Sequence, residues 1–185
     1  MRRGHKAGAQ LIFRGTPAYP AAFNDLNDAP PLFWAVGDAT LLRRPTLGLV
    51  GARNASSLGT RMSRFLATTL GNQGYVICSD LARGVDATAH AASIGTRTIA
   101  VLGGGVDVIY PAENAQLTRQ IRENGLLISE QPMGTQPQAR HFPVRNRLIS
   151  GLSQAIVVIE AAAKSGSLIT AKTALDQGRD VYVVP

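Results

Sequence analysis

The chain has 185 residues, of which 45% are hydrophobic and 17% are charged. This length and composition exclude a disordered tail, a collagen-like fibre and a coiled coil, and they are typical of one globular domain. Lysine and arginine together number 19 against 12 acidic residues, which gives a net charge of +7. All but three of the basic residues are arginines, whose planar guanidinium suits phosphate. This balance favours a polyanionic partner, although a GC-rich genome would leave the same bias.

No stretch approaches the roughly 20 apolar residues of a membrane span, and the basic start at residues 1–6 is not followed by the apolar segment of a signal peptide. We therefore predict a cytoplasmic protein with no membrane partner. The single cysteine, Cys78, lies in an apolar run and has no second cysteine to pair with, so it is expected to be a core residue.

Residues 1–45, in which Pro17, Pro20, Pro30 and Pro31 interrupt the apolar residues, predict an irregular lead-in with a short helix at 21–26 and one added strand at 32–36. From residue 46 onward, short apolar runs alternate with segments of helical spacing. The expected strands are 47–50, 75–78, 98–102, 126–129, 155–159 and 181–184, and the expected helices are 59–70, 86–93, 114–124, 146–152 and 167–177.

Strands that are apolar without alternation are buried on both faces of a sheet. Their alternation with helices predicts an α/β fold, in which a doubly wound, mostly parallel Rossmann-like sheet in residues 46–185 has helices on both faces. The sequence stops at Pro185, directly after a strand, so we expect it to be part of a longer protein.

Four of these strands are followed by loops rich in glycine and serine, at residues 51–57, 79–86, 103–107 and 160–167. Parallel strands bring such loops to one edge of the sheet, where ligands bind in open α/β folds. Unobstructed backbone N–H groups before a helix attract phosphate, and Arg53 and Lys164 add positive charge. Helix caps and tight turns would explain any single loop, but the four together predict a phosphate site.

Signatures of other chemistries are missing. The Gly48–Gly51 segment is not G-x-G-x-x-G, and Lys164-Ser165 lacks the upstream glycine of a Walker A loop. His90 reads as a packing or capping residue, and no histidine has metal-ligand spacing. Asp86, Asp107 and Glu160 could approach one another at the strand ends, but acids there usually cap helices. No assembled active site, metal site or cofactor is predicted.

The densest basic passage is residues 138–147, where Arg140, Arg145 and Arg147 accompany Phe142. Arginine interleaved with an aromatic ring suits single-stranded nucleic acid, because the guanidinium binds phosphate and the ring stacks on a base. In the alternative interpretation, Phe142 fills the core and the arginines are solvated or pair with Glu130 and Glu160.

Five motifs occur in the order found in the DNA-processing protein A (DprA/Smf) family, and the chain resembles that family from about residue 19 to 185. The motifs are Gly51-Ala52-Arg53 with Ser56 and Gly59, LARGVDATAH at 81–90, GGGVDVIYPAEN at 103–114, FPVRNRLISGLS at 142–153 and KSGSLITA at 164–171.

The resemblance implies an extended Rossmann fold that binds and protects single-stranded DNA during natural transformation, helps to load the RecA recombinase and forms homodimers. It implies binding rather than catalysis. It places the phosphate pocket at Gly51, Arg53, Ser56, Ser165, Gly166 and Ser167, with Lys164, Arg145 and Asn146 as further contacts, Phe142 as the stacking ring and Arg140 as a nearby basic contact.

Two features depart from the family pattern. The second strand ends in Ser79-Asp80 instead of the usual Ser-Gly, which places a carboxylate beside the pocket. Family members also tend to carry a helical domain before this region and a winged-helix domain after it, and these residues include neither. Two alternatives stay open: a phosphoribohydrolase-like enzyme, whose Pro-Gly-Gly-x-Gly-Thr signature is missing, and a sensor of a small nucleotide.

Overall fold

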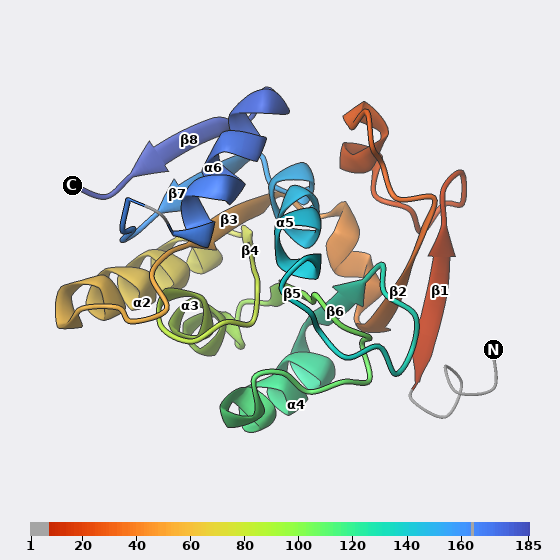
Figure 1. Cartoon of the computed structure of the whole chain (residues 1–185), viewed down its shortest axis with the longest axis horizontal. Coiled ribbons are helices and arrows are strands. Elements are labelled where there is room, and N and C mark those ends of the chain that lie inside the picture. Colours follow the sequence, from red (N-terminus) through yellow and green to blue (C-terminus); the bar gives the residue numbers. More distant parts are fainter. Residues whose placement is uncertain (1–7, 164) are drawn as a thin grey trace.

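One eight-stranded sheet, in the order β1-β2-β6-β5-β4-β3-β7-β8, organises the protein (Figure 1). The structure is a computed structural model that describes residues 8–163 and 165–185. Six neighbouring strands are parallel, and β1 and β2 extend the sheet antiparallel beside β6. The strands are β1 (Ala9–Phe13), β2 (Leu32–Gly37), β3 (Thr46–Val50), β4 (Val76–Ser79), β5 (Thr98–Val101), β6 (Leu126–Ser129), β7 (Ala155–Val158) and β8 (Asp180–Val183). The predicted α/β fold with a mostly parallel sheet is confirmed.

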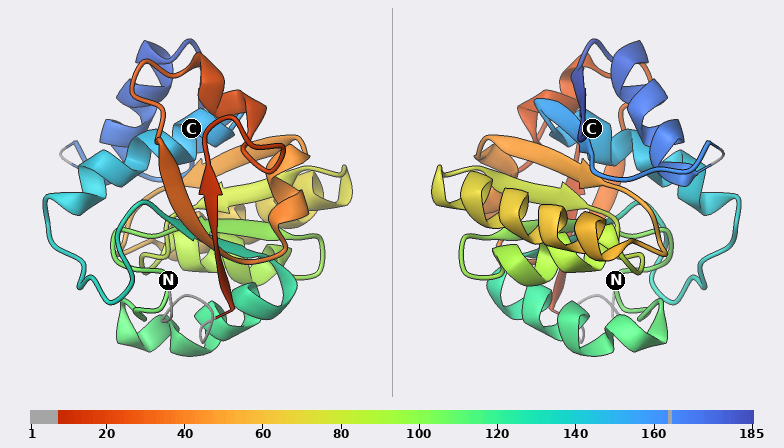
Figure 2. Two further views of the ribbon diagram at one scale, coloured as in Figure 1. Left: turned by 90° about the vertical axis from the view of Figure 1, so that its right-hand side faces the viewer. Right: turned by 90° about the vertical axis from the view of Figure 1, so that its left-hand side faces the viewer.

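Helices cover both faces of the sheet, as Figure 2 shows. One face is covered by α2 (Ser57–Asn72), α3 (Val85–Ser93) and α4 (Ala115–Asn124), and the other by α5 (His141–Leu152), α6 (Gly166–Asp176) and the 3-10 helix η1 (Ala21–Asp25). Strands β4, β5 and β6 are fully buried, as expected for apolar strands between two helical layers. In the described ranges 8–163 and 165–185, no helix is both long and apolar enough to cross a membrane.

The lead-in contains more structure than the sequence predicted. It forms η1 and β2 as expected, but also β1 and a second 3-10 helix, η2 (Ala39–Arg43). Its aromatic side chains enter the main core: Tyr19, Phe23 and Phe33 lie with ring centroids 5.8–5.9 Å apart. They belong to the same buried cluster as Leu148 and Ile149 of α5. This segment therefore shares its core with the domain that it precedes.

One helix boundary differs in a way that matters for the site. The sequence predicted a helix from residue 146, but α5 begins at His141. Pro143 caused the error, because proline usually breaks helices. In the first turn, however, its missing N–H costs nothing, since the first N–H groups of a helix have no acceptor within it. Phe142 and Arg145 therefore lie on the first turns of a helix instead of in a loop.

The strand order reverses between β3 and β7, and this reversal opens the site. The helix that follows β3, α2, goes to one face of the sheet, and the helix that follows β7, α6, goes to the other. The loops after these neighbouring strands therefore separate at the carboxyl edge of the sheet. Ligands of doubly wound folds bind at such a reversal.

Candidate functional site

A cleft of about 660 Å³ opens at this edge, between the loops after β3, β4 and β7 and the first turns of α5 and α6. All four glycine- and serine-rich loops were expected to converge, and three of them line this cleft. Residues of the fourth loop, after β5, line a smaller pocket of about 160 Å³ that shares a wall with the cleft. The predicted site residues that line the cleft are Gly51, Arg53, Phe142, Arg145, Asn146, Ser165, Gly166 and Ser167.

The wall between the two cavities is an aromatic ring with a cation on it. Phe142 lines both cavities, and the guanidinium carbon of the exposed Arg53 lies 5.7 Å from the centre of its ring. Tyr110 stacks on the same ring at a centroid distance of 6.0 Å and an interplanar angle of 24°. Gly103 packs so closely that a Cβ there would lie 2.9 Å from Phe142. The ring is thus fixed in place beside an exposed guanidinium.

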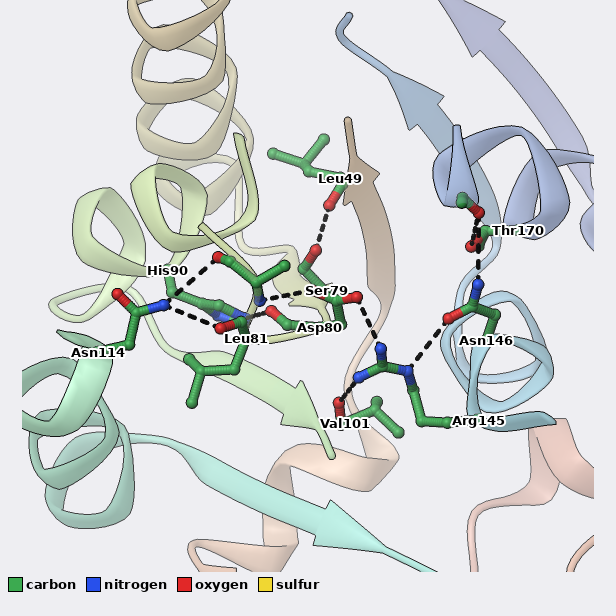
Figure 3. A network of polar contacts seen from close by, with 12 residues as sticks. Leu49, Ser79, Asp80, Leu81, His90, Val101, Asn114, Arg145, Asn146 and Thr170 are labelled. Atoms are coloured by element: carbon green, nitrogen blue, oxygen red, sulfur yellow. Dashed lines mark hydrogen bonds and ion pairs between the residues drawn. The ribbon is translucent and has the colours of Figure 1, made fainter. Parts of the chain in front are cut away.

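Arg145 is buried and its charge is paired with a carboxylate of the protein. It was expected to contact phosphate directly, and the structure instead gives it partners within the protein. Its Nη2 donates to Asp80 Oδ2 at 2.7 Å, Nη1 donates to the Val101 carbonyl, and Nε donates to Asn146 Oδ1 at 3.1 Å. The side chain is only 6% exposed. Asn146 continues the network by donating from Nδ2 to the Gly166 carbonyl at 3.4 Å (Figure 3). Arg145 therefore ties β4 and β5 to the first turn of α6.

Two neighbouring carboxyl groups on the floor of the cleft have pKa values that are shifted in opposite directions. Burial alone would raise the pKa of Asp80, but the Arg145 charge and the Ala82 backbone N–H hold that pKa below its usual value. For Asp86, burial and then the neighbouring Asp80 charge raise the pKa well above its usual value. The two shifts run in opposite directions, because this environment favours the ionised form of Asp80 and the protonated form of Asp86.

The first turn of α6 is the open backbone site of the cleft. Gly166 is exposed and Ser165 precedes the helix as its N-cap residue. Among the described residues, no side chain caps this turn, because Ser165 Oγ lies 2.7 Å from Ser167 Oγ instead. The uncapped N–H groups and the positive end of the helix dipole are suited to an anion.

The first turn of α2 is closed by the protein itself. Ser56 Oγ accepts from the Gly59 N–H at 3.0 Å and donates to Glu160 Oε2 at 2.9 Å, while the Ser56 N–H donates to the same oxygen at 3.0 Å. A Cβ on Gly59 would collide with Glu160 Oε2, so the glycine makes this approach possible. The Glu160 carboxylate therefore occupies the place where an anion would bind.

Two predicted contacts lie elsewhere. Ser56 is engaged with Glu160 and does not line the cleft, although it adjoins it. Arg140 is exposed just before α5, outside both cavities. Lys164 lies outside the described residues. Arg147 pairs with Glu130 at 2.7 Å and with Asp28 at 3.0 Å, which matches the alternative interpretation for Glu130 but not for Glu160.

The other titratable residues considered in the sequence make contacts within the protein. His90 is fully buried; its Nε2 donates to the Asp80 carbonyl at 2.6 Å and its Nδ1 lies 2.7 Å from the Thr98 hydroxyl. Burial raises the pKa of the Cys78 thiol to about 12, as expected for a core residue. Asp107 accepts from the Gly134 N–H in a separate loop. The sequence analysis missed Tyr110, although it lies within the motif at 103–114.

The chain is similar to known proteins along nearly its whole length. A family model for DNA recombination-mediator protein A matches residues 10–185. The chain belongs to this family. It is 46% identical to DNA processing protein DprA of Bacillus subtilis over 181 residues, which cover 96% of this chain and 61% of that protein. The chain spans about half to three-fifths of the length of the curated relatives that it matches.

Two solved structures of this family resemble the fold along nearly the whole chain. DNA processing protein A from Streptococcus pneumoniae matches with a TM-score of 0.92 and 38% identity, over 100% of this chain and 66% of that one. The Helicobacter pylori protein, whose structure describes a single-stranded DNA binding mode, matches with a TM-score of 0.90 and 31% identity, over 96% of this chain and 80% of that one. The resemblance seen in the sequence motifs is confirmed.

Proposed function

We propose that this protein binds single-stranded DNA in the cleft, with the sugar-phosphate chain against the first turn of α6 and a base against Phe142. The observation that carries the proposal is the Arg53 guanidinium, exposed and 5.7 Å from the centre of the Phe142 ring. Such a pair offers a cation to a phosphate and an aromatic face to the adjacent base. The Helicobacter pylori relative, which binds single-stranded DNA, supports the same assignment here.

Each group in the cleft has a distinct role in this proposal. The N–H groups of Gly166 and Ser167 hold one phosphate, and the neighbouring hydroxyl of Ser165 donates to it. Arg53 holds the next phosphate, and the loop at Gly51 leaves room for the chain. Arg145 and Asn146 are positioning residues, because their polar atoms join the network behind Phe142 and Gly166. Arg140, exposed just before α5, would extend the contacts beyond the cleft, and the positive charge of Lys164 would add to the attraction for phosphate.

A preference for unpaired DNA follows from the shape of the site. Stacking on Phe142 requires a base that is not paired, and the pocket beside the ring has a volume of only about 160 Å³. A base pair within a duplex cannot present one face to a side chain without unstacking, which costs a few kcal/mol. Duplex DNA would therefore reach only the exposed charges.

We further propose that the protein protects incoming single-stranded DNA and assists the loading of the RecA recombinase onto it, in the cytoplasm, during natural transformation and recombination. The description of the matching family as a recombination mediator supports this role. The role requires binding and transfer of a strand and no cleavage of a bond, so no catalytic residue and no cofactor are assigned.

A homodimer is part of the proposal. Among the described residues, β8 lies at one edge of the sheet, and Leu175 of α6, Tyr182 and Val183 are more than half exposed beside it. An edge strand with apolar neighbours is suited to pairing with a second copy. Sedimentation of Tyr182→Asp should give a monomer where the parent chain gives a dimer, and a parent chain that is monomeric at all concentrations would contradict the proposal.

The cleft is tested by titrating a labelled oligonucleotide of about 20 nucleotides with two variants and a control. Arg53→Ala and Phe142→Ala should each weaken binding by about tenfold, the effect expected for one phosphate or stacking contact. Arg43→Ala is the matched control, because Arg43 lies in η2, which precedes β3 and so sits at the opposite edge of the sheet. Unchanged affinity in both cleft variants would overturn the proposal. Release of free base from nucleoside monophosphates would instead favour the phosphoribohydrolase alternative.

A further inference from the structure

The outer face of α2 carries exposed arginine and aromatic side chains that the cleft does not use. Arg61 and Arg64 are exposed, and within the described residues neither forms an ion pair. Phe65 is 60% exposed and Leu58 is 54% exposed on the same helix. The helix contains no acidic residue along its whole length. A cationic helix that exposes a phenylalanine combines the two features that bind single strands elsewhere.

These side chains form one continuous surface. At 100° per residue, Arg64, Arg61, Phe65 and Leu58 follow one another around the solvent side of α2, opposite the buried positions 59, 63, 67 and 71. Arg64 and Thr68, one turn apart, also form one wall of a groove of about 700 Å³ between α2, α3 and α4. These three helices lie side by side on one face of the sheet (Figure 2).

This groove meets the pocket beside Phe142 at a shared residue. Glu113 lines both, so one surface continues from the cleft past Phe142 into the groove. Among the residues that the structure describes, Glu113 is the only acid that lines the groove. Arg83 Nε lies 3.4 Å from Glu113 Oε1, and both side chains are more than half exposed. Arg83 therefore offsets the negative charge at the junction. Apart from Arg64, the other polar side chains that line the groove are neutral and can hydrogen-bond to a strand without reading its sequence: Thr68, Thr88, Gln116 and Gln120.

We propose that a single strand that is longer than the cleft continues past Glu113 into the groove between α2, α3 and α4, where Arg61 and Arg64 contact its phosphates and Phe65 stacks on a base. The occupant is a strand of DNA because the surface has positive charge and an exposed ring, and because it is continuous with a cleft to which the same ligand is assigned. The proposal rests on the proposed function and adds a second segment to the binding site.

The length of the oligonucleotide separates the two segments. Oligothymidine of about 6 nucleotides can fill the cleft only, whereas oligothymidine of about 20 nucleotides reaches α2 as well. The double variant Arg64→Ala/Phe65→Ala should bind the long probe about tenfold more weakly than the parent chain does. Its affinity for the short probe should stay within twofold of the parent value. Fluorescence anisotropy measures both affinities. Both side chains are exposed, so the fold should be unaffected, which circular dichroism would verify.

The salt dependence gives a second readout. Removing Arg61 and Arg64 should reduce the slope of log affinity against log salt by about 0.7 for each arginine, and only with the long probe. Arg43→Ala should leave both probes unchanged. If the α2 variants bind the long probe as tightly as the parent chain does, or lose the same affinity for both probes, then DNA does not bind in the groove. If the parent chain fails to bind even the short probe, the proposed function itself is wrong, and the proposed binding in the groove is wrong with it.

Discussion

Arg145 Nη2 lies 2.7 Å from Asp80 Oδ2 on the floor of the cleft, and both side chains are largely buried. The arginine that the sequence offers as a phosphate ligand is thus bound to the carboxylate that departs from the family pattern. Burying two charged groups costs desolvation free energy. Their mutual attraction offsets that cost only when the geometry is good and further hydrogen bonds are formed. Here the Val101 carbonyl, Asn146 Oδ1 and the Ala82 N–H supply those bonds.

Asp80→Asn should therefore move stability and DNA affinity in opposite directions. Loss of the carboxylate leaves the Arg145 charge buried without a counter-ion, which should lower the free energy of unfolding by about 3 kcal/mol. The cleft also gains one positive charge, so its affinity for an oligonucleotide should rise about fivefold at low salt. Urea unfolding and anisotropy titration measure the two effects.

Asp176→Asn provides the control for that substitution, because it removes one negative charge from an exposed position near the end of α6. It should leave both quantities close to those of the parent chain. If Asp80→Asn weakens DNA binding together with stability, then the pair holds the cleft in shape and its charge does not limit affinity.

Glu160→Gln should strengthen DNA binding at a small cost in stability. The carboxylate lies against the first turn of α2 and caps it through Ser56. Losing its charge at the positive end of a helix should cost about 0.3–1 kcal/mol. The neutral amide competes less with a phosphate, so affinity should rise a few-fold and the salt slope should steepen. Weaker binding in Glu160→Gln would indicate that the carboxylate itself contacts the ligand.

His90 should make the protein sensitive to mild acid. Burial lowers the pKa of His90 to about 4 from its usual 6.5. As the pH falls below 6.5, the unfolded chain takes up a proton that the folded chain does not, so stability is lost between about pH 6.5 and pH 4. The loss reaches about 3 kcal/mol at the lower end. The stability should be fully present above pH 6.5.

His90→Gln isolates this contribution. Asp86 has a raised pKa and so favours the folded state toward lower pH, but that effect is common to both proteins. Urea unfolding across this range should therefore give a shallower acid loss for His90→Gln than for the parent chain, whatever its absolute stability. Equal pH slopes would mean that His90 binds a proton in the folded state.

Much of the fold could be predicted because its strands are apolar without alternation and are separated by helical spacing. Positions 126–129 match β6 residue for residue, and η1 was expected one residue longer than observed. The strand β1 was not predicted, because its five residues beside a basic terminus are too few to show a clear strand pattern of hydrophobic residues. Its place is fixed by pairing with β2, a contact that local sequence does not encode. The start of α5 was wrong because a proline has opposite meanings inside a helix and in its first turn.

The site was predicted as a set of residues but not as a set of contacts. Glycine and serine loops after parallel strands located the cleft correctly, since topology brings strand ends together. Which cations are free could not be deduced: Arg53 is exposed, while Arg145 meets Asp80 across 65 positions of sequence. Likewise, the serine-rich starts of α2 and α6 look alike, and only the approach of Glu160 to Ser56 leaves α6 as the open one.

In the proposed function, the cleft at the β3–β7 reversal binds an unpaired strand through its phosphates and one base. A fluorescence titration of the 185-residue chain with matched single-stranded and duplex oligonucleotides, each at two salt concentrations, is the decisive test. We expect tight binding of the single strand, at least tenfold weaker binding of the duplex, and affinity that falls steeply as salt rises. Equal affinity for both forms, or binding that salt leaves unchanged, would contradict it.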